Sequence, residues 1–361
     1  MRIMLGERTR RLRLEDVAKL ANVSVSTVSR VVNGVDTVNA STRKRVLKVL
    51  EKSNYHPNLQ ARSLVVGSSR TIGIIVSNLL NPFFVDVFHA IEGEARANGF
   101  EVLVGNTNYD ADQLSANIRM MIGRRVAGIA LVISEKLPPA LSELVGVGIP
   151  IAIYDVGTQG KGIANIRFDN RKGMMQIVEY LYSMGHRRMA YIGLSSALLP
   201  TDVRRSAFLE IAARNSMETR DFKISFQEGF KGARAAVRDI VKSGFDPTAI
   251  ICVNDMIAIG ALRELRDHGI DVPGHVSVTG FDNIEFSEFT APSLTTIQIP
   301  RDEVGHRMFE AILAGAKNRT NAGEEYMFRP ELVVRESTGV ARASNDSRRT
   351  RSKALPGVIR P

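Results

Sequence analysis

The stretch 14-LEDVAKLANVSVSTVSRVVNG-34 carries the strongest structural signal in this 361-residue chain. Helices are expected over 14–21 and 25–32, because small or apolar residues recur there at helical spacing and should pack against each other: Val17, Ala18, Ala21, Val28 and Val31. Residues 21–24 can turn the chain steeply between the halves, and Ser24 is a good N-cap for the second helix. With a third helix expected over 41–53, the pattern predicts an all-α helix-turn-helix domain over residues 12–56.

The outward side of the second predicted helix suits a DNA-reading surface. Ser26 and Arg30 are placed to reach base edges in the major groove, where arginine pairs well with guanine. Short polar residues nearby are placed to reach phosphates: Ser24, Thr27, Asn33 and Thr42. A three-helix cluster that binds another protein is the alternative for this domain.

The distribution of charge favours an anionic partner. Residues 1–70 contain fourteen Lys or Arg and five Asp or Glu, a net charge of +9. Residues 341–361 contain six Lys or Arg and one Asp, a net charge of +5. Because the whole chain has a net charge of +10, residues 71–340 have a net charge of −4. A basic head on a mildly acidic body is what DNA would favour. We expect residues 1–11 to be a basic extension and residues 341–361 a basic flexible tail, although charge alone also fits a solvated extension without a partner.

Composition argues against several other classes of protein. The longest apolar runs, such as 126-VAGIALVI-133, fall far short of the roughly 20 residues that cross a bilayer, and no apolar signal segment follows the basic start. Cys252 is the single cysteine, which excludes a disulfide framework. The six histidines show no helical zinc spacing, and no Walker loop, G-x-G-x-x-G or G-x-S-x-G motif is present. We expect a cytoplasmic, non-enzymatic protein with no catalytic residues, metal, cofactor or membrane contact.

From residue 71 onward, short β-branched runs alternate with amphipathic segments. Strands are expected over 71–76, 101–105, 127–133, 149–154, 188–193, 222–226, 248–253 and 275–280. Helices are expected over 82–98, 110–124, 170–184, 201–213, 230–243 and 254–268. Apolar strands separated by helices indicate parallel sheets covered on both faces. About ten strands are too many for one comfortable sheet, so the α/β body is predicted to be two-lobed, with two doubly wound parallel sheets.

Polar residues follow several predicted strands at their carboxyl ends. They are Ser77 and Asn78, Asp155, Asn254 and Asp255, and Asp282 and Asn283. Doubly wound sheets bind ligands outside the carboxyl ends of their strands, so these residues predict a small-molecule cleft. Capping of the helices that follow is the alternative role for Asp155, Asn254 and Asp282.

Motifs along most of the chain resemble the lactose/galactose-repressor family. The opening stretch is followed by 42-TRKRVLKVLEKSNYHPNLQARSL-64, 71-TIGIIVSNLLNPFF-84, 182-YSMGHRRMAYIG-193, 250-IICVNDMIAIGAL-262, 276-VSVTGFDN-283 and 291-APSLTTI-297. The resemblance covers roughly residues 12–340 and implies a body like that of periplasmic sugar-binding proteins. It places the N-lobe at about 71–168 and 299–326, and the C-lobe at about 169–298 and 327–340.

The same resemblance implies how the head and the linker engage DNA. Val25, Ser26 and Arg30 stand where members of the family read bases. Residues 57–70 match the hinge helix and linker, in which Asn58, Ala61 and Leu64 would enter the minor groove, with Leu64 as the wedge that unstacks a base step. Ordinary packing of the linker is the alternative for Leu64. Two heads on a homodimer imply a pseudo-palindromic operator in double-stranded DNA, and the tail has no apolar heptads for a tetramerising coiled coil.

For the cleft, the resemblance implies six effector-binding residues: Phe83, Phe84, Asp155, Arg204, Asn254 and Asp282. Carboxylates, an amide and a guanidinium suit the hydroxyls of a sugar, polyol or sugar acid, while aromatic faces stack on a ring. The two phenylalanines could instead belong to the core. The chain departs from the family at Ala207, where glycine is usual, and in the loop 195–203. Either Phe226 or Phe230 could supply a stacking ring from the C-lobe.

These features predict a transcription regulator, most simply a repressor, whose operator affinity is controlled by a small molecule through the angle between the lobes. Whether the effector releases or promotes DNA binding stays open. The alternative is a sugar-binding protein or sugar-acting enzyme with no role on DNA.

Overall fold

The computed structural model describes residues 13–32, 36–53, 69–156, 163–195, 199–225, 228–318 and 325–343, in two compact units that divide after Ser69. The predicted hinge residues Asn58, Ala61 and Leu64 lie outside the described residues, as do Asn33 and Phe226.

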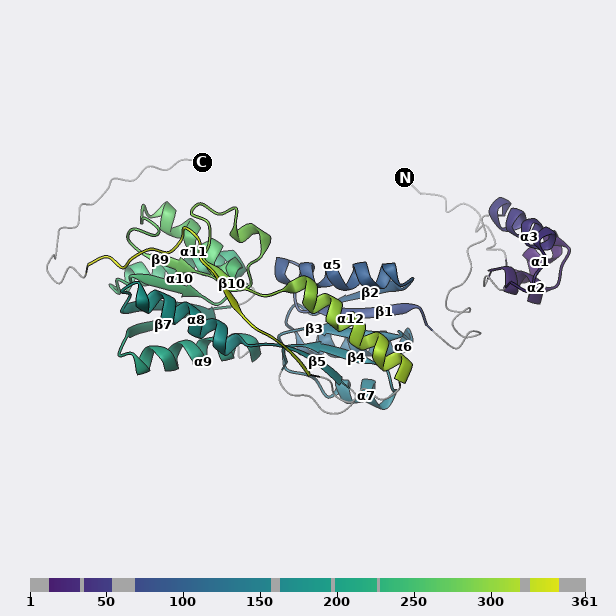
Figure 1. The fold of residues 1–361 in the computed structure, drawn as a ribbon, viewed down its shortest axis with the longest axis horizontal. Coiled ribbons are helices and arrows are strands. Elements are labelled where there is room, and N and C mark those ends of the chain that lie inside the picture. Colours follow the sequence, from purple (N-terminus) through teal and green to yellow (C-terminus); the bar gives the residue numbers. More distant parts are fainter. Residues whose placement is uncertain are drawn as a thin grey trace, which may run out of the picture. The chain divides into compact units, whose positions relative to one another are not determined.

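The described residues of the N-terminal unit form three helices, α1 (Leu14–Ala21), α2 (Val25–Val32) and α3 (Ala40–Lys52) (Figure 1). The first two have the predicted bounds, and the third begins one residue earlier than predicted. Their apolar faces form one small core: Val17, Ala18, Ala21, Val28, Val31 and Val46. Ser24 caps α2 as expected, because its hydroxyl accepts a hydrogen bond of 3.2 Å from the Thr27 N–H. Arg13 is not a side-chain cap for α1, but its N–H donates to Asp16 Oδ2 over 2.8 Å.

The first lobe of the body is built on a parallel sheet with strand order β11-β5-β4-β3-β1-β2. The strands are β1 (Thr71–Val76), β2 (Glu101–Asn106), β3 (Gly128–Val132), β4 (Ile151–Tyr154), β5 (Ile163–Phe168) and β11 (Glu325–Phe328). In β1, Ile72, Ile74 and Val76 face one apolar cluster, whereas Ile75 faces another. This alternation places α5 (Pro82–Ala97) and α12 (Arg301–Asn318) on one face, and α6 (Ala111–Gly123) and α7 (Ala140–Gly146) on the other.

The second lobe has a smaller parallel sheet with strand order β7-β6-β8-β9. The strands are β6 (Arg188–Leu194), β7 (Glu218–Ile224), β8 (Ala249–Cys252) and β9 (Ser277–Thr279). Helices α8 (Asn170–Ser183) and α9 (Leu199–Arg214) pack together on one side, while α10 (Gly229–Lys242) and α11 (Asp255–Asp267) pack together on the other. A short 3-10 helix, η2 (Glu285–Ser287), and an antiparallel pair, β10 (Thr296–Gln298) with β12 (Glu331–Val333), complete the lobe.

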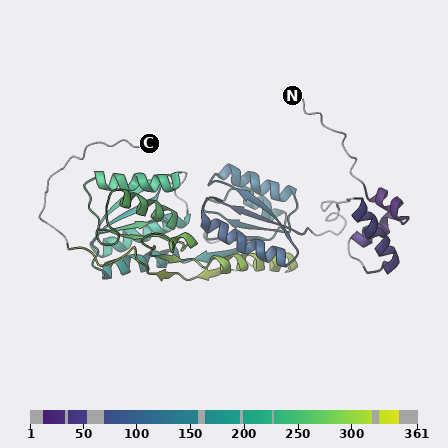
Figure 2. The same ribbon diagram turned by 90° about the horizontal axis from the view of Figure 1, so that it is seen from above.

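The two lobes lie side by side and are joined by crossing segments, as Figure 2 shows. The chain crosses between β5 and α8, between β10 and α12, and between β11 and β12. The last crossing follows Phe328, whereas the sequence predicted that the chain passes from the N-lobe to the C-lobe at about 326–327. Crossings of this kind allow the lobes to change their angle while each sheet stays intact.

The structure corrects several predicted elements. Strand β7 begins at Glu218, four residues before its prediction, because only Ile224 of this edge strand is buried and its sequence ETRDFKI shows no apolar run. The sequence prediction also omitted β5, β10, β11 and β12, together with α7 and α12. Helix α12 had a detectable signal, since Val304, Met308 and Ile312 recur at intervals of four and are fully buried.

Candidate functional site

The N-terminal unit exposes the predicted reading surface on α2. Arg30 and Ser26 are exposed and lie one helical turn apart, and Val25 is 41% exposed, whereas Val28 and Val31 fill the core. The first turn of α2 therefore presents its side chains to solvent from a packed support.

Of the predicted phosphate-binding residues, three lie within the described part of the head. The Ser24 hydroxyl lies 2.8 Å from Thr27 Oγ1 and 2.9 Å from Ser26 Oγ, so these hydroxyls form one local group at the start of α2. Thr42 is half-buried in the first turn of α3, where its N–H donates to Asn39 Oδ1 over 2.8 Å. Both helix starts thus carry hydroxyl groups where phosphate binding is favourable.

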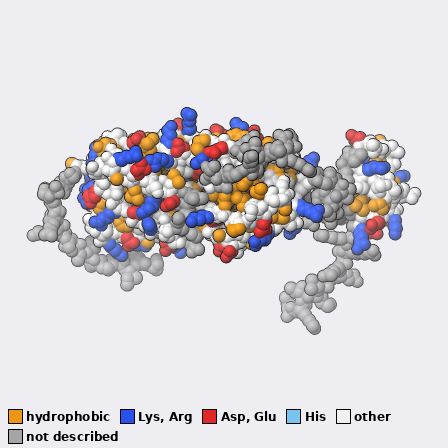
Figure 3. All heavy atoms as spheres, turned by 90° about the horizontal axis from the view of Figure 1, so that it is seen from below, with side chains coloured by type: hydrophobic (Ala, Val, Ile, Leu, Met, Phe, Trp, Pro, Cys, Tyr) orange, Lys and Arg blue, Asp and Glu red, His pale blue; other side chains and the backbone are white. Residues whose placement is uncertain are grey.

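On the face of the body shown in Figure 3, positively charged side chains are not gathered in one area. Lys and Arg side chains there are interspersed with Asp and Glu rather than gathered by sign. Exposed arginines of the body also form ion pairs, among them Arg188–Glu218 at 2.7 Å and Arg214–Glu210. This face is therefore a poor candidate for a polyanion, in keeping with the slightly negative charge of residues 71–340.

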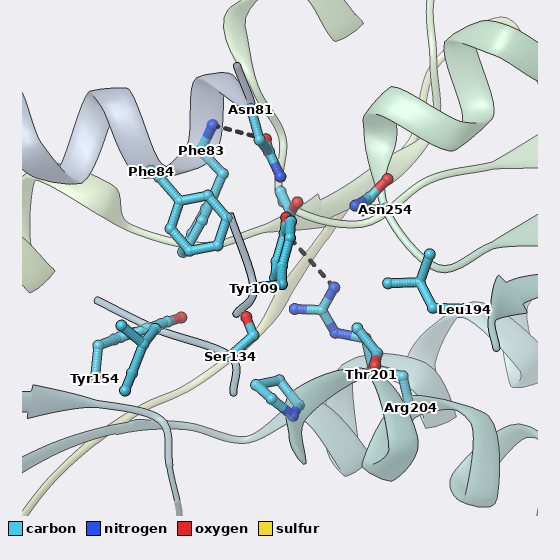
Figure 4. A pocket seen from close by; sticks show the side chains of 13 residues that line it. Asn81, Phe83, Phe84, Tyr109, Ser134, Tyr154, Leu194, Thr201, Arg204 and Asn254 are labelled. Carbon is cyan, nitrogen blue, oxygen red and sulfur yellow. Dashed lines mark hydrogen bonds and ion pairs between the residues drawn. The ribbon is translucent and has the colours of Figure 1, made fainter. Parts of the chain in front are cut away.

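A hollow of about 490 Å³, partly open to solvent, lies between the two lobes of the body. Side chains from both lobes line it, as Figure 4 shows. The N-lobe contributes four aromatic rings, Phe83, Phe84, Tyr109 and Tyr154, and the C-lobe contributes Arg204, Asn254 and Asp282. Five of the six predicted effector residues therefore meet at one cleft, at the carboxyl ends of the strands.

Arg204 on α9 is the central polar group of the cleft. Its Nε donates to Asn170 Oδ1 over 2.7 Å, and its Nη1 donates to the Val253 carbonyl over 2.9 Å and to Asp282 Oδ1 over 3.3 Å. The guanidinium carbon also lies 3.7 Å from the centre of the Phe281 ring. The Arg204 and Asp282 side chains are each only 7% exposed, so the ion pair is largely excluded from water.

Asp282 is held by its backbone as well as by its carboxylate. Its φ of +120° lies where non-glycine residues rarely occur. Two contacts fix this conformation, since the Asp282 N–H donates to the Ile297 carbonyl over 3.0 Å and Arg301 Nη1 donates to the Asp282 carbonyl. Strained backbone that is retained in this way is a common feature of ligand sites.

Asp155, the sixth predicted effector residue, does not line the cleft. Its Oδ1 accepts a hydrogen bond of 3.2 Å from the Phe168 N–H, and its Oδ2 accepts one from Asn170 Nδ2. Asn170 Oδ1 in turn accepts a hydrogen bond from Arg204, so Asp155 contacts Arg204 only through Asn170 and helps to orient it. Direct contact between Asp155 and a ligand is therefore not supported by the geometry.

Some of the cleft residues also have the alternative roles considered for them, which are helix capping and core packing. Asn254 caps α11 by accepting a hydrogen bond of 3.0 Å from the Ile257 N–H, and it lines the cleft at the same time. Phe83 and Phe84 are 6% and 4% exposed and belong to the core cluster, yet they also border the hollow with ring centres 5.2 Å apart. Phe230, one of the two proposed stacking rings, is 46% exposed and is not among the cleft residues.

The sequence prediction missed several cleft residues, notably Tyr109, Ser134, Tyr154 and Thr201. The strand-end signal that selected Asp155 could have found two of them, since Tyr154 ends β4 and Ser134 follows β3. The Tyr154 hydroxyl is buried and has no hydrogen-bond partner within the described residues. A buried hydroxyl of this kind is costly unless a ligand or water binds it.

Burial raises the pKa of Asp282 to about 7, although Arg204 lowers it in part. Burial likewise raises the pKa of Asp155 to about 6, against the hydrogen bonds from Phe168 and Asn170. Since a carboxyl group with a raised pKa in the folded state binds protons on folding, its contribution to stability is present at low pH and is lost as the pH rises through the folded pKa.

We therefore expect the free energy of unfolding to depend on pH through Asp282. Between pH 8 and pH 5.5, this carboxyl group should add about 1–2 kcal/mol to stability. Urea unfolding at both pH values measures this as the difference between the wild type and Asp282→Asn, in which the other titrating groups cancel. An identical pH dependence in the two proteins would contradict the raised pKa.

Comparison with known proteins agrees with both halves of this architecture. Residues 13–58 match the family described as bacterial regulatory proteins, lacI family, and residues 178–338 match the periplasmic binding protein-like domain. The HTH-type transcriptional repressor PurR of Vibrio parahaemolyticus serotype O3:K6 is 32% identical over 327 residues, which cover 90% of this chain and 98% of that protein.

Solved structures of regulators show the same fold. The lac repressor dimer bound to operator and the anti-inducer ONPF is 27% identical, with a TM-score of 0.77, and the match covers 91% of this chain and 100% of that one. The complex of the transcriptional regulator CelR with cellobiose is 25% identical, with a TM-score of 0.66 and the same coverage.

A helix-turn-helix unit joined to a two-lobed body with a polar cleft defines a DNA-binding regulator that carries a ligand-binding domain. The chain belongs to the lacI family of bacterial regulatory proteins and is a transcriptional repressor. The prediction of fold class and of a non-enzymatic regulator agrees with these relatives, which are repressors rather than enzymes. In the described ranges, no helix is both long and apolar enough to cross a membrane, and no group of three or more acidic, His or Cys side chains is placed to hold a metal ion.

Proposed function

We propose that a sugar, polyol or sugar acid binds between the lobes and controls the affinity of this repressor for its operator. The observation that carries this proposal is the buried Arg204–Asp282 pair, which borders the same hollow as Tyr154. The hydroxyl of Tyr154 has no hydrogen-bond partner among the residues that the structure describes. Each hydroxyl of a polyol both donates and accepts hydrogen bonds, so it can satisfy an aspartate, an arginine and a tyrosine together.

The remaining residues of the cleft supply shape and orientation. Phe83 and Phe84 offer ring faces or edges to the apolar side of the ligand, and Asn254 adds an amide from the C-lobe. Asp155 acts through Asn170 by holding Arg204 in place. The cellobiose complex of the CelR regulator supports a sugar as the class of ligand.

On DNA, Val25, Ser26 and Arg30 read bases from the start of α2. Phosphate contacts come from short polar residues at the helix starts and the adjoining turn: Ser24, Thr27, Asn33 and Thr42. The exposure of the α2 surface and the net charge of +9 over residues 1–70 support this assignment. In the hinge, Asn58, Ala61 and Leu64 enter the minor groove, with Leu64 as the wedge.

The functional unit is a homodimer on a pseudo-palindromic operator. The lac repressor, which shares this fold, was solved as a dimer bound to operator. In this chain, Phe286 and Phe289 are 57% and 75% exposed, which is unusual for large aromatic residues unless a partner covers them. The effector changes the angle between the lobes and with it the spacing of the two hinge segments, because it binds one arrangement better than the other.

A thermal-shift screen of sugars, polyols and sugar acids tests the ligand, using the full-length protein. One compound should raise the melting temperature by about 5 °C or more near saturation. The compound should also change the affinity for an operator selected from random duplexes, as measured by fluorescence anisotropy. Asp282→Ala should remove both effects, whereas Glu210→Ala on the surface of α9 should leave them intact. A full thermal shift in Asp282→Ala would refute the site.

A further inference from the structure

A second hollow, of about 640 Å³ and partly open to solvent, lies in the C-lobe beside α10 and α11. Six buried apolar side chains line it: Val237, Ile240, Phe245, Ile250, Leu265 and Val276. Its polar lining residues include Asp246 and His275. A hollow with this lining has an unfavourable contact with water, so it is a site for an apolar group.

The described part of the chain ends at the edge of this hollow. The Ala341 N–H donates to the Met184 carbonyl over 2.9 Å, which fixes the segment to the C-lobe. Arg342 Nε then donates to the His275 carbonyl over 3.0 Å, and its guanidinium forms an ion pair with Asp246. Residues 341–343 were predicted to begin a flexible tail, but 341 and 342 are bound to the C-lobe next to the hollow.

We propose that the apolar segment 354-ALPGVI-359 of the same chain binds in this hollow. The segment lies outside the described residues and follows a polar, basic stretch, 344-SNDSRRTRSK-353. Twelve residues lie between Arg342 and Leu355. An extended chain over the thirteen steps from Arg342 to Leu355 reaches about 45 Å. The segment can therefore return to the hollow from its anchored start without moving the body.

The segment 354–359 is covalently attached to the body, which favours its binding over that of a free peptide. A short flexible linker gives its end an effective concentration in the millimolar range, so a contact of millimolar affinity is enough for substantial occupancy. Leu355, Val358 and Ile359 supply aliphatic side chains that match the lining. The basic stretch before them is complementary in charge to Asp246, which lines the hollow and is 53% exposed even though it pairs with Arg342.

Disulfide trapping in the full-length protein tests this contact. Val241 lines the hollow and is 44% exposed, so Val241→Cys combined with Val358→Cys places one thiol at the hollow and one in the segment. The native Cys252 is fully buried and should not interfere. We expect an intramolecular disulfide to form about tenfold faster than in the control pair Val145→Cys with Val358→Cys. Val145 is 43% exposed but lies on α7 of the other lobe.

Adding Leu355→Asp and Ile359→Asp to the test pair should slow cross-linking to the control rate, because charged side chains do not enter an apolar hollow. Equal rates for the test and control pairs would overturn the proposal, as would a rate unchanged by the two aspartates. Cross-linked dimers, identified by mass, would overturn it as well, by assigning the hollow to the segment of a second copy.

Discussion

Replacing Arg204 with alanine should lower the free energy of unfolding by about 3–5 kcal/mol and abolish the response to the effector. The guanidinium is almost completely buried and contacts Asn170, Asp282, the Val253 carbonyl and the Phe281 ring. Its removal leaves the Asp282 carboxylate buried without its cation. Because the pKa of Asp282 is already about 7, protonation can relieve part of this cost, so the loss should lie near 3 kcal/mol below pH 7 and be larger above it. Urea unfolding at pH 6 and pH 8 measures both values.

Two comparisons separate stability from ligand binding in this experiment. Arg171→Ala breaks the exposed pair with Glu210 and should cost less than about 1 kcal/mol. Arg204→Met combined with Asp282→Asn removes both buried charges and should restore most of the stability, because no charge is then left buried without its partner. The double variant should still fail to respond to the effector. A retained response would show that the pair supports the fold without binding the ligand.

The sequence allowed most of the architecture to be predicted because its dominant signals are local. Helices α1 and α2 were predicted to the residue, since each has a buried stripe and a short turn between them. Strands β1 and β6 are continuous apolar runs and were equally clear. Strand β10 is only three residues long and β11 has no buried residue, and the pairing of both depends on contacts distant in sequence, so no local pattern reveals them.

The difference between local signals and contacts distant in sequence also explains which cleft residues were predicted and which were missed. Asn254 lies two residues after β8 and Asp282 lies three residues after β9, close enough for the strand-end rule to locate them. Asp155 satisfies the same rule, but Asn170 binds its carboxylate and holds it away from the hollow. Tyr109 comes three residues after β2 but is not one of the Ser, Asn and Asp residues that the rule selected. Thr201 lies in the first turn of α9, where only the packing of the two lobes brings it to the cleft. Such residues cannot be found from spacing along the chain alone.

On DNA, Arg30→Ala should remove most of the discrimination between the operator and random duplex. A bidentate contact from arginine to guanine is worth about 1–3 kcal/mol per half-site. In a dimer on a two-fold site, the two contacts together correspond to a loss of roughly 30-fold to 10⁴-fold in specific affinity. Arg30 is exposed and lies outside the core of Val28 and Val31, so the fold of the head should be unaffected.

The measurement is fluorescence anisotropy with the selected operator and a scrambled duplex over a range of salt concentrations. Arg45→Ala is the matched control, because Arg45 is an exposed arginine on α3 and not on the reading helix α2. If its contact is electrostatic, Arg45→Ala should weaken binding to both duplexes alike and leave their ratio unchanged, whereas Arg30→Ala should reduce the ratio itself. If Arg30→Ala lowers both affinities equally, Arg30 contacts phosphates, and the bases must be read by other residues of the head.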